Sequence, residues 1–92
     1  MAKILKSINS PQPEDILSCA LLGKYVRAKR TQLGLTIETA AAFCGVAKDT
    51  LMKLEHGHAK MQLGSALHIC QGLGVRLVVV PWENEDKQDV WV

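Results

Sequence analysis

Aromatic side chains are scarce in this chain of 92 residues, which contains Tyr25, Phe43, Trp82 and Trp91 and no others. Because large rings are so few, the hydrophobic core has to be aliphatic, and small aliphatic side chains suit short helices packed at close range. The length allows one domain at most. A domain of this size buries a real core but gains modest stability, so association with a second copy would help it.

The sequence also lacks the features of a membrane protein or an enzyme. No run of apolar residues approaches the ~18 that are needed to span a bilayer, so we expect no membrane partner. His56 and His58 have no matching cysteine pair nearby, which argues against a metal ion. No set of a nucleophile and a base is recognisable, so we expect neither catalytic activity nor a cofactor.

Cysteine occurs three times, an odd number, and without the close spacing of a metal site or a disulfide framework. Cys19, Cys44 and Cys70 each lie among apolar residues, which predicts three buried free thiols. Free thiols are typical of a reducing compartment, and we therefore expect a cytoplasmic protein.

The formal net charge of +2 conceals an uneven distribution along the chain. Residues 18–60 contain seven lysines and arginines against three acidic residues, whereas residues 83–92 contain four acidic residues and one lysine. A basic middle followed by an acidic end suits a polyanionic ligand for the middle and a separate role for the end. Ordinary solvated charge explains this distribution equally well when it is taken alone.

The first predicted helix follows a start signal at residues 10–15. There Ser10 can act as a cap, two prolines suit a first turn, and two acidic residues favour the positive end of a helix. We expect a long helix from this signal to about Leu33, ended by Gly34. The residues at helical spacing that would form its inner face are Leu22, Val26, Arg30 and Leu33.

Three shorter helices are predicted after the first one. Thr36 can cap the second helix, and Gly45 makes a tight turn into a third helix over about residues 47–56. Gly57 ends the third helix, and a fourth is expected over about residues 62–72. The residues expected to face inward are Ile37, Ala40, Ala41 and Cys44, then Val46, Leu51 and Leu54, then Leu63, Ala66, Leu67, Cys70 and Leu73.

The chain changes character at residues 75–82, where β-branched residues predict a strand. A single strand leaves its backbone donors and acceptors without partners. Residues 2–8 offer only a weak second strand, so pairing with the same strand of another subunit is the simplest solution. Residues 83–92 are expected to form a flexible acidic tail. The residues expected in the dimer interface are Val75, Leu77, Val78, Val79, Val80 and Trp82.

The second and third predicted helices, with Gly45 in the turn between them, have the order of the helix-turn-helix unit that reads DNA. In such a unit the second of the two helices presents short polar side chains to base edges, while the first crosses the phosphate backbone. The side chains expected to face outward for this purpose are Lys48, Asp49, Met52 and Lys53.

Two stretches of this region resemble a known family. They read Leu22-Gly23-x-x-Val26-Arg27-x-x-Arg30-x-x-x-Gly34-Leu35-Thr36 and Gly45-Val46-Ala47-x-x-Thr50-Leu51-x-x-Leu54-Glu55-x-Gly57. Together they resemble the Xre/Cro family of phage and bacterial regulators over about residues 20–74. The resemblance implies a lambda-repressor-like bundle of four to five helices that binds palindromic double-stranded DNA as a homodimer.

The same resemblance implies roles for single residues at the DNA. Lys48, Asp49 and Lys53 fall where members of the family read bases, and Ala47 occupies the usual cap or base-contact position. Lys60 lies in the loop that usually meets a phosphate. Asp49 would repel phosphate, so it either accepts a hydrogen bond from a cytosine amino group or orients Lys53.

Other positions are structural or depart from the family. Arg30 and Glu55 match an ion pair that links the first and third helices. Met52 either touches a thymine methyl group or is merely exposed. Ile37 stands where the family prefers glutamine, and Ala47 stands where serine or threonine is commoner. Both departures would weaken polar contacts with DNA.

A helical domain followed by an apolar strand and a tail ending near Trp91 resembles the HipB-type antitoxins, which repress their own operon and bind a HipA-type kinase toxin. The expected layout is an arm (1–15), the helix-turn-helix domain (16–74), the dimerisation strand (75–82) and the tail (83–92), with Trp91 as an anchor for the kinase. Two alternatives stay open. One is a free-standing Xre regulator, such as a phage repressor or a restriction controller, and the other is a module that sequesters a partner and binds DNA weakly.

Overall fold

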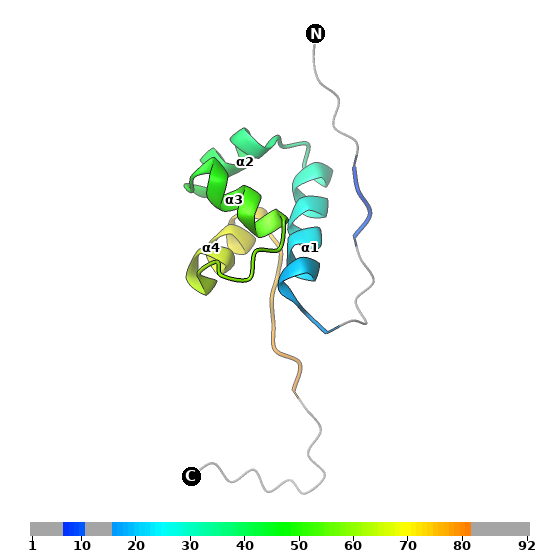
Figure 1. Cartoon of the computed structure of the whole chain (residues 1–92). Helices are drawn as coiled ribbons and strands as arrows, with labels where there is room; N and C mark the ends of the chain where they lie inside the picture. Colours follow the sequence, from blue (N-terminus) through cyan, green and yellow to red (C-terminus); the bar gives the residue numbers. More distant parts are fainter. Residues whose placement is uncertain (1–6, 11–15, 82–92) are drawn as a thin grey trace, which may run out of the picture.

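The computed structural model describes residues 7–10 and 16–81, and within them the chain forms four α-helices. These helices are α1 (Cys19–Gln32), α2 (Ile37–Cys44), α3 (Lys48–Glu55) and α4 (Leu63–Leu73). In Figure 1, α1 runs along one side of the domain; α3 and α4 pack against it, and α2 packs on α3 and α4. The prediction of a mainly helical bundle is confirmed, and no helix here is long and apolar enough to cross a membrane.

The start of α1 differs from the prediction. Residues 16–18 are not helical, and the helix begins at Cys19 with Ser18 as its N-cap. The Ser18 hydroxyl accepts a hydrogen bond from the Leu21 N–H at 3.1 Å, which satisfies a donor that the first turn would otherwise leave without a partner. Ile16 is 92 % exposed, so an earlier start would bury little apolar surface to offset the entropy of ordering more residues.

Residues 7–10 lie against the end of α1 instead of leading into it. The Thr31 hydroxyl accepts a hydrogen bond from the Ile8 N–H at 3.2 Å, and the Gln32 amide donates to the Ile8 carbonyl at 2.7 Å. The Ser10 hydroxyl, expected as a helix cap, lies 3.4 Å from the same Gln32 amide. This part of the predicted arm therefore bonds to the helix through the Ile8 backbone and the Ser10 hydroxyl.

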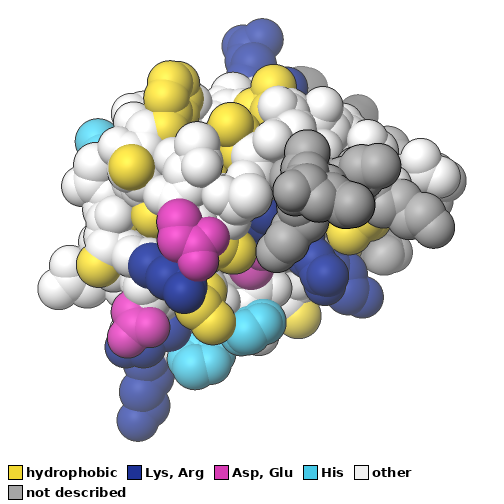
Figure 2. Space-filling view, turned by 90° about the horizontal axis from the view of Figure 1, so that it is seen from above, with side chains coloured by type: hydrophobic (Ala, Val, Ile, Leu, Met, Phe, Trp, Pro, Cys, Tyr) yellow, Lys and Arg dark blue, Asp and Glu magenta, His cyan; other side chains and the backbone are white. Residues whose placement is uncertain are grey.

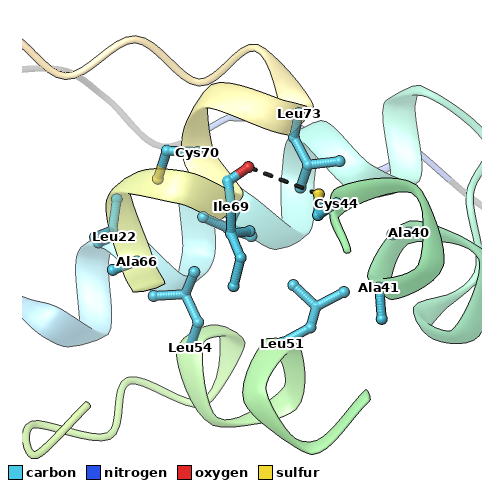
Figure 3. Close-up of a cluster of buried hydrophobic side chains, with 11 residues drawn as sticks. Leu22, Ala40, Ala41, Cys44, Leu51, Leu54, Ala66, Ile69, Cys70 and Leu73 are labelled. Carbon is cyan, nitrogen blue, oxygen red and sulfur yellow. Dashed lines mark hydrogen bonds between the residues drawn. The ribbon is translucent and has the colours of Figure 1, made fainter. Parts of the chain in front are cut away.

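The core is aliphatic, as the scarcity of rings predicted. Figure 3 shows side chains from all four helices meeting in one cluster, with the Cys44 thiol donating to the Ile69 carbonyl across 3.9 Å. Leu51, Ile69 and Val26 are completely buried. The full cluster consists of Leu22, Val26, Ala40, Ala41, Cys44, Leu51, Leu54, Ala66, Ile69, Cys70 and Leu73.

Four residues expected inside lie at the surface. Leu63 is 69 % exposed and Leu67 is 38 % exposed, because the inner stripe of α4 runs through Ile69 on the neighbouring face. Leu33 is the C-cap of α1, where the chain turns away from the core, and it is half-exposed. Cys19 is exposed because it opens α1 at the edge of the domain, so the prediction of three buried thiols is wrong for this one.

A close backbone approach joins α1 to the end of α3. A Cβ atom built on Gly23 would lie 2.5 Å from the Leu54 carbonyl oxygen and 2.6 Å from the Glu55 carbonyl oxygen. Since Cβ atoms do not approach backbone oxygens so closely, a larger residue at this position would push the two helices apart. Gly23 therefore fixes how deeply α3 sits against α1.

Residues 75–81 follow α4; their first part lies against the helices and their last part extends beyond them (Figure 1). They form no hydrogen-bonded strand within the described part of the chain, so the fold contains the predicted helices without the predicted strand. Val75 and Leu77 are half-buried against the core, whereas Val78 and Val79 are exposed, the latter by 81 %.

Candidate nucleic-acid interface

The turn between α2 and α3 is fixed by local backbone bonds. Thr36 caps α2 through a hydrogen bond from the Thr39 N–H to its hydroxyl, as predicted. At the other end Gly45 adopts φ +72° and ψ +31°, a left-handed conformation that costs glycine little and other residues more. The Val46 N–H donates to the Ala41 carbonyl at 2.9 Å and closes the turn.

The outward face of α3 carries charged side chains. Lys48, Asp49 and Lys53 are exposed, whereas Leu51 and Leu54 on the opposite side are buried, so α3 is anchored through one face only. Ala47 is the N-cap of α3 and makes no side-chain hydrogen bond, as its lack of a hydroxyl predicted. The backbone donors of the first turn of α3 therefore have no side-chain acceptor from their own cap.

Met52 occupies an intermediate position on this helix. Its side chain is half-buried and lines a hollow of about 210 Å³ together with residues of α1 and α2. Met52 is therefore not simply exposed, because it is partly buried on the side of α3 that faces these residues. The other residues that line this hollow are Arg27, Arg30, Ile37, Glu55 and His56.

An ion pair connects the first turns of α2 and α3. The Lys48 ammonium nitrogen lies 3.1 Å from a Glu38 carboxylate oxygen, and the two side chains are 54 % and 66 % exposed. Of the two roles expected for Asp49, orientation of Lys53 finds no salt bridge among the described residues, and acceptance from a cytosine stays a prediction. Most of the charged and histidine side chains visible in Figure 2 lie along the lower part of that view.

A second ion pair anchors α3 from behind. Arg30 and Glu55 meet through two parallel hydrogen bonds, from Nε to Oε2 at 2.6 Å and from Nη2 to Oε1 at 3.0 Å. The remaining guanidinium nitrogen, Nη1, donates to the Leu35 carbonyl at 2.9 Å. The predicted pair is therefore present, and it is nearly fully buried, with side-chain exposures of 8 % and 4 %.

Lys53 and Lys60 line the same hollow, which has a volume of about 350 Å³ and lies between α3 and the start of α4. Lys60 is exposed in the loop before α4, as expected for a residue that meets a ligand from outside. His58, which the sequence analysis considered only as a metal ligand, contributes its imidazole to this hollow. Its remaining lining residues are Thr50, Met61, Gln62 and Ser65.

The two buried cysteines lie behind the candidate interface, between α2 and α4. Burial raises the pKa of the Cys44 thiol, and burial together with the neighbouring Cys44 raises the pKa of Cys70. A raised pKa keeps both thiols protonated and unreactive near neutral pH. No group of three or more His, Cys, Asp or Glu side chains able to hold a metal occurs in residues 7–10 and 16–81.

The expected dimer and partner residues are only partly visible. Val80, like Val78 and Val79, is exposed and offers apolar surface, while Trp82 and Trp91 lie outside the described residues. No family model matches the chain, and no curated protein matches it either.

Proposed function

We propose that this protein is a homodimeric, sequence-specific DNA-binding repressor and the antitoxin of a HipA-like kinase toxin–antitoxin module. The observation that carries the proposal is the geometry of α3. This helix is held from behind by buried leucines and by the Arg30–Glu55 ion pair, while Lys48, Asp49 and Lys53 project from its open face. A rigidly held helix with polar side chains on its outer face is what major-groove reading requires.

The electrostatics of the neighbouring loop support the same proposal. Lys53 and Lys60 meet in one hollow and form no salt bridge within the described residues. Lysines whose charge is not met by a carboxylate are available for phosphates, which supply most of the affinity in DNA binding. Lys53 would read a base, and Lys60 would hold the backbone beside it.

The test of DNA binding is selection of duplexes from a randomised library, followed by fluorescence anisotropy on the selected sequence. We expect Lys53→Ala to weaken binding to that sequence by roughly 1–3 kcal/mol. Lys60→Ala should weaken binding to all DNA sequences equally and make the slope of log affinity against log salt shallower by about one. Lys24→Ala, on the exposed side of α1, is the matched control. The assigned face is wrong if the double variant Lys48→Ala/Lys53→Ala binds as tightly as the wild type.

The homodimer is proposed to form through residues 75–82, paired antiparallel with those of a second copy. Three successive exposed valines, Val78 to Val80, would gain burial and backbone partners in such a pair. The two reading helices would then meet half-sites about one helical turn, ~34 Å, apart. Val78→Pro removes a backbone donor and should give monomers or aggregates, whereas Val78→Thr keeps that donor and the β-branch. Sedimentation that finds the proline variant as an intact dimer would exclude this interface.

The kinase partner is proposed to capture the tail through Trp91. A tryptophan on a tether buries a large area with few rotatable bonds, and the acidic residues around it would steer it to a basic surface and away from DNA. Truncation after Gln88 should leave folding and DNA binding intact and weaken capture of a kinase encoded beside this protein. If the truncated protein still binds that kinase with full affinity, the helical domain or residues 75–82 must form the docking surface.

The two alternatives make different predictions in the same assays. A free-standing Xre regulator would select a palindromic sequence but would have no kinase partner. A partner-sequestering module is favoured by Ile37 and Ala47, neither of which offers a polar side chain to DNA. Such a module would bind its partner tightly and select no sequence from the library.

A further inference from the structure

The Glu38–Lys48 ion pair lies at the start of the helix that is proposed to read DNA. Lys48 is the first residue of α3, and Glu38 lies in the first turn of α2. The two residues are joined at 3.1 Å, and both side chains remain more than half exposed. The pair therefore lies where an approaching ligand can compete for either partner.

We infer that Glu38 is a positioning residue that determines the DNA specificity of Lys48, an inference that rests on the proposed function. The ammonium group of a lysine ends a flexible chain of four carbon atoms, so it has no preferred direction of its own. The carboxylate of Glu38 holds that ammonium beside the N-terminus of α3. From there Lys48 can donate to the O6 and N7 acceptors of a guanine in the major groove.

The same carboxylate lowers the affinity for DNA of arbitrary sequence. Binding to any duplex depends on cations that neutralise phosphates and release counterions. The charge of Lys48 is already met by Glu38, in contrast to the charges of Lys53 and Lys60, which form no salt bridge within the described residues. Glu38 would also be repelled by a phosphate that replaced it. The ion pair thus makes the Lys48 ammonium less available to phosphates of any sequence, while the ammonium can still bind a base edge.

An exposed ion pair of this kind is weak, so Lys48 can also donate a hydrogen bond to a guanine. Exposed ion pairs stabilise by amounts that correspond to between about 1.5-fold and 5-fold in an equilibrium constant. We therefore expect Glu38→Gln to bind a duplex of random sequence about 1.5-fold to 5-fold more tightly than the wild type. Its log affinity should also depend on log salt with a slope steeper by about one, because Lys48 becomes free to bind a phosphate.

The experiment compares the wild type with Glu38→Gln, Glu38→Asp, Lys48→Gln and the double variant Glu38→Gln/Lys48→Gln. Each protein is measured on a random-sequence duplex over a range of salt concentrations, and each is used to select from a randomised duplex library. Glu38→Gln should lose a guanine preference at one position of each half-site. Glu38→Asp keeps the charge but shortens the side chain, so it should keep weak random binding and lose part of that preference. In the Lys48→Gln background the Glu38 change should alter neither the slope nor the selected bases.

The outcomes separate the two proposals. If the wild type selects no sequence and binds duplexes without salt dependence, the proposed DNA binding fails and this inference fails with it. If the wild type selects a sequence, and Glu38→Gln melts like the wild type and has the same random affinity, slope and selected bases, only the inference is overturned. A tighter, more salt-dependent and less selective Glu38→Gln protein supports it.

Discussion

The buried ion pair between Arg30 and Glu55 allows a quantitative test of how α3 is held. Both side chains are more than nine-tenths buried, and two parallel hydrogen bonds join them. Glu55→Ala would leave a buried guanidinium whose remaining acceptor is the Leu35 carbonyl. Removing one partner of a buried pair costs about 3–5 kcal/mol, because the other charge has lost its compensation.

That cost is a large fraction of what holds such a domain together. Small proteins unfold with a free energy of roughly 5–15 kcal/mol, so Glu55→Ala should remove at least about a fifth of that free energy. With about 4–8 °C of melting temperature for each kcal/mol in a domain of this size, the expected decrease is roughly 12 °C or more. The exposed Glu38–Lys48 pair supplies a matched control, since Glu38→Ala should cost only ~0–1 kcal/mol.

The assay is urea denaturation followed by the helical circular dichroism signal for Arg30→Ala, Glu55→Ala and the double variant. Once one partner is gone, removal of the other should cost little or even restore stability, so the double variant should be more stable than additivity predicts. The coupling should exceed 1 kcal/mol, within the range of roughly 0.5–3 kcal/mol found for residues in contact. Strict additivity, or a Glu55→Ala loss no larger than that of Glu38→Ala, would refute the reasoning.

Two further predictions concern the helix contacts and the thiols. Gly23→Ala should destabilise the domain by about 1–3 kcal/mol, because its Cβ would overlap backbone oxygens of α3. A Cβ at Gly64 meets nothing within 4 Å, so Gly64→Ala should stabilise the domain by up to about 1 kcal/mol. Thermal melts compare the two variants, and equal effects would contradict the close approach. Iodoacetamide should alkylate exposed Cys19 quickly, and should alkylate Cys44 and Cys70 only after unfolding, since burial raises the pKa of both thiols. Mass spectrometry follows the three reactions in the native protein. Equal rates at all three cysteines would contradict the burial of Cys44 and Cys70.

Much of the helical framework could be predicted because its signals are local. Thr36 provides a cap hydroxyl at the required distance along the chain, and Gly34 provides the left-handed residue that ends α1. Leu51 and Leu54 repeat at a spacing that places them on one side of a helix, so the exposure of Lys48 and Lys53 on the other side followed from periodicity. Such signals depend on the backbone within one or two turns.

Predictions failed where two local signals competed. The start signal at residues 10–15 resembled a helix start, yet Ser18 also offers a cap hydroxyl, and the helix begins there. In α4 the stripe through Leu63 and Leu67 and the stripe through Ile69 both satisfy helical spacing. Periodicity alone could not choose between neighbouring faces, because the choice depends on where α2 packs.

Of the two ion pairs at the candidate site, one was expected from the sequence and the other was not. The Arg30–Glu55 pair was expected only because the surrounding pattern resembles a family, since the two residues are far apart in sequence. The Glu38–Lys48 pair was missed, because it depends on how the first turns of two separate helices face each other across the Gly45 turn. The conformation of that turn decides the pairing, and residue types alone do not specify it.

The way in which α3 is held by the rest of the domain affects how its ligand preference could evolve. The buried contacts that fix the helix come from its inner side, through Leu51, Leu54, Glu55 and the Gly23 approach. Position 48 adds only the exposed ion pair with Glu38, and positions 49 and 53 are exposed on the outer side. Mutations there could alter the recognised ligand at little cost in folding free energy, so that new binding preferences could arise by single steps. A library with these three positions randomised should consequently yield mostly folded proteins, a useful starting point for selecting variants with altered preferences.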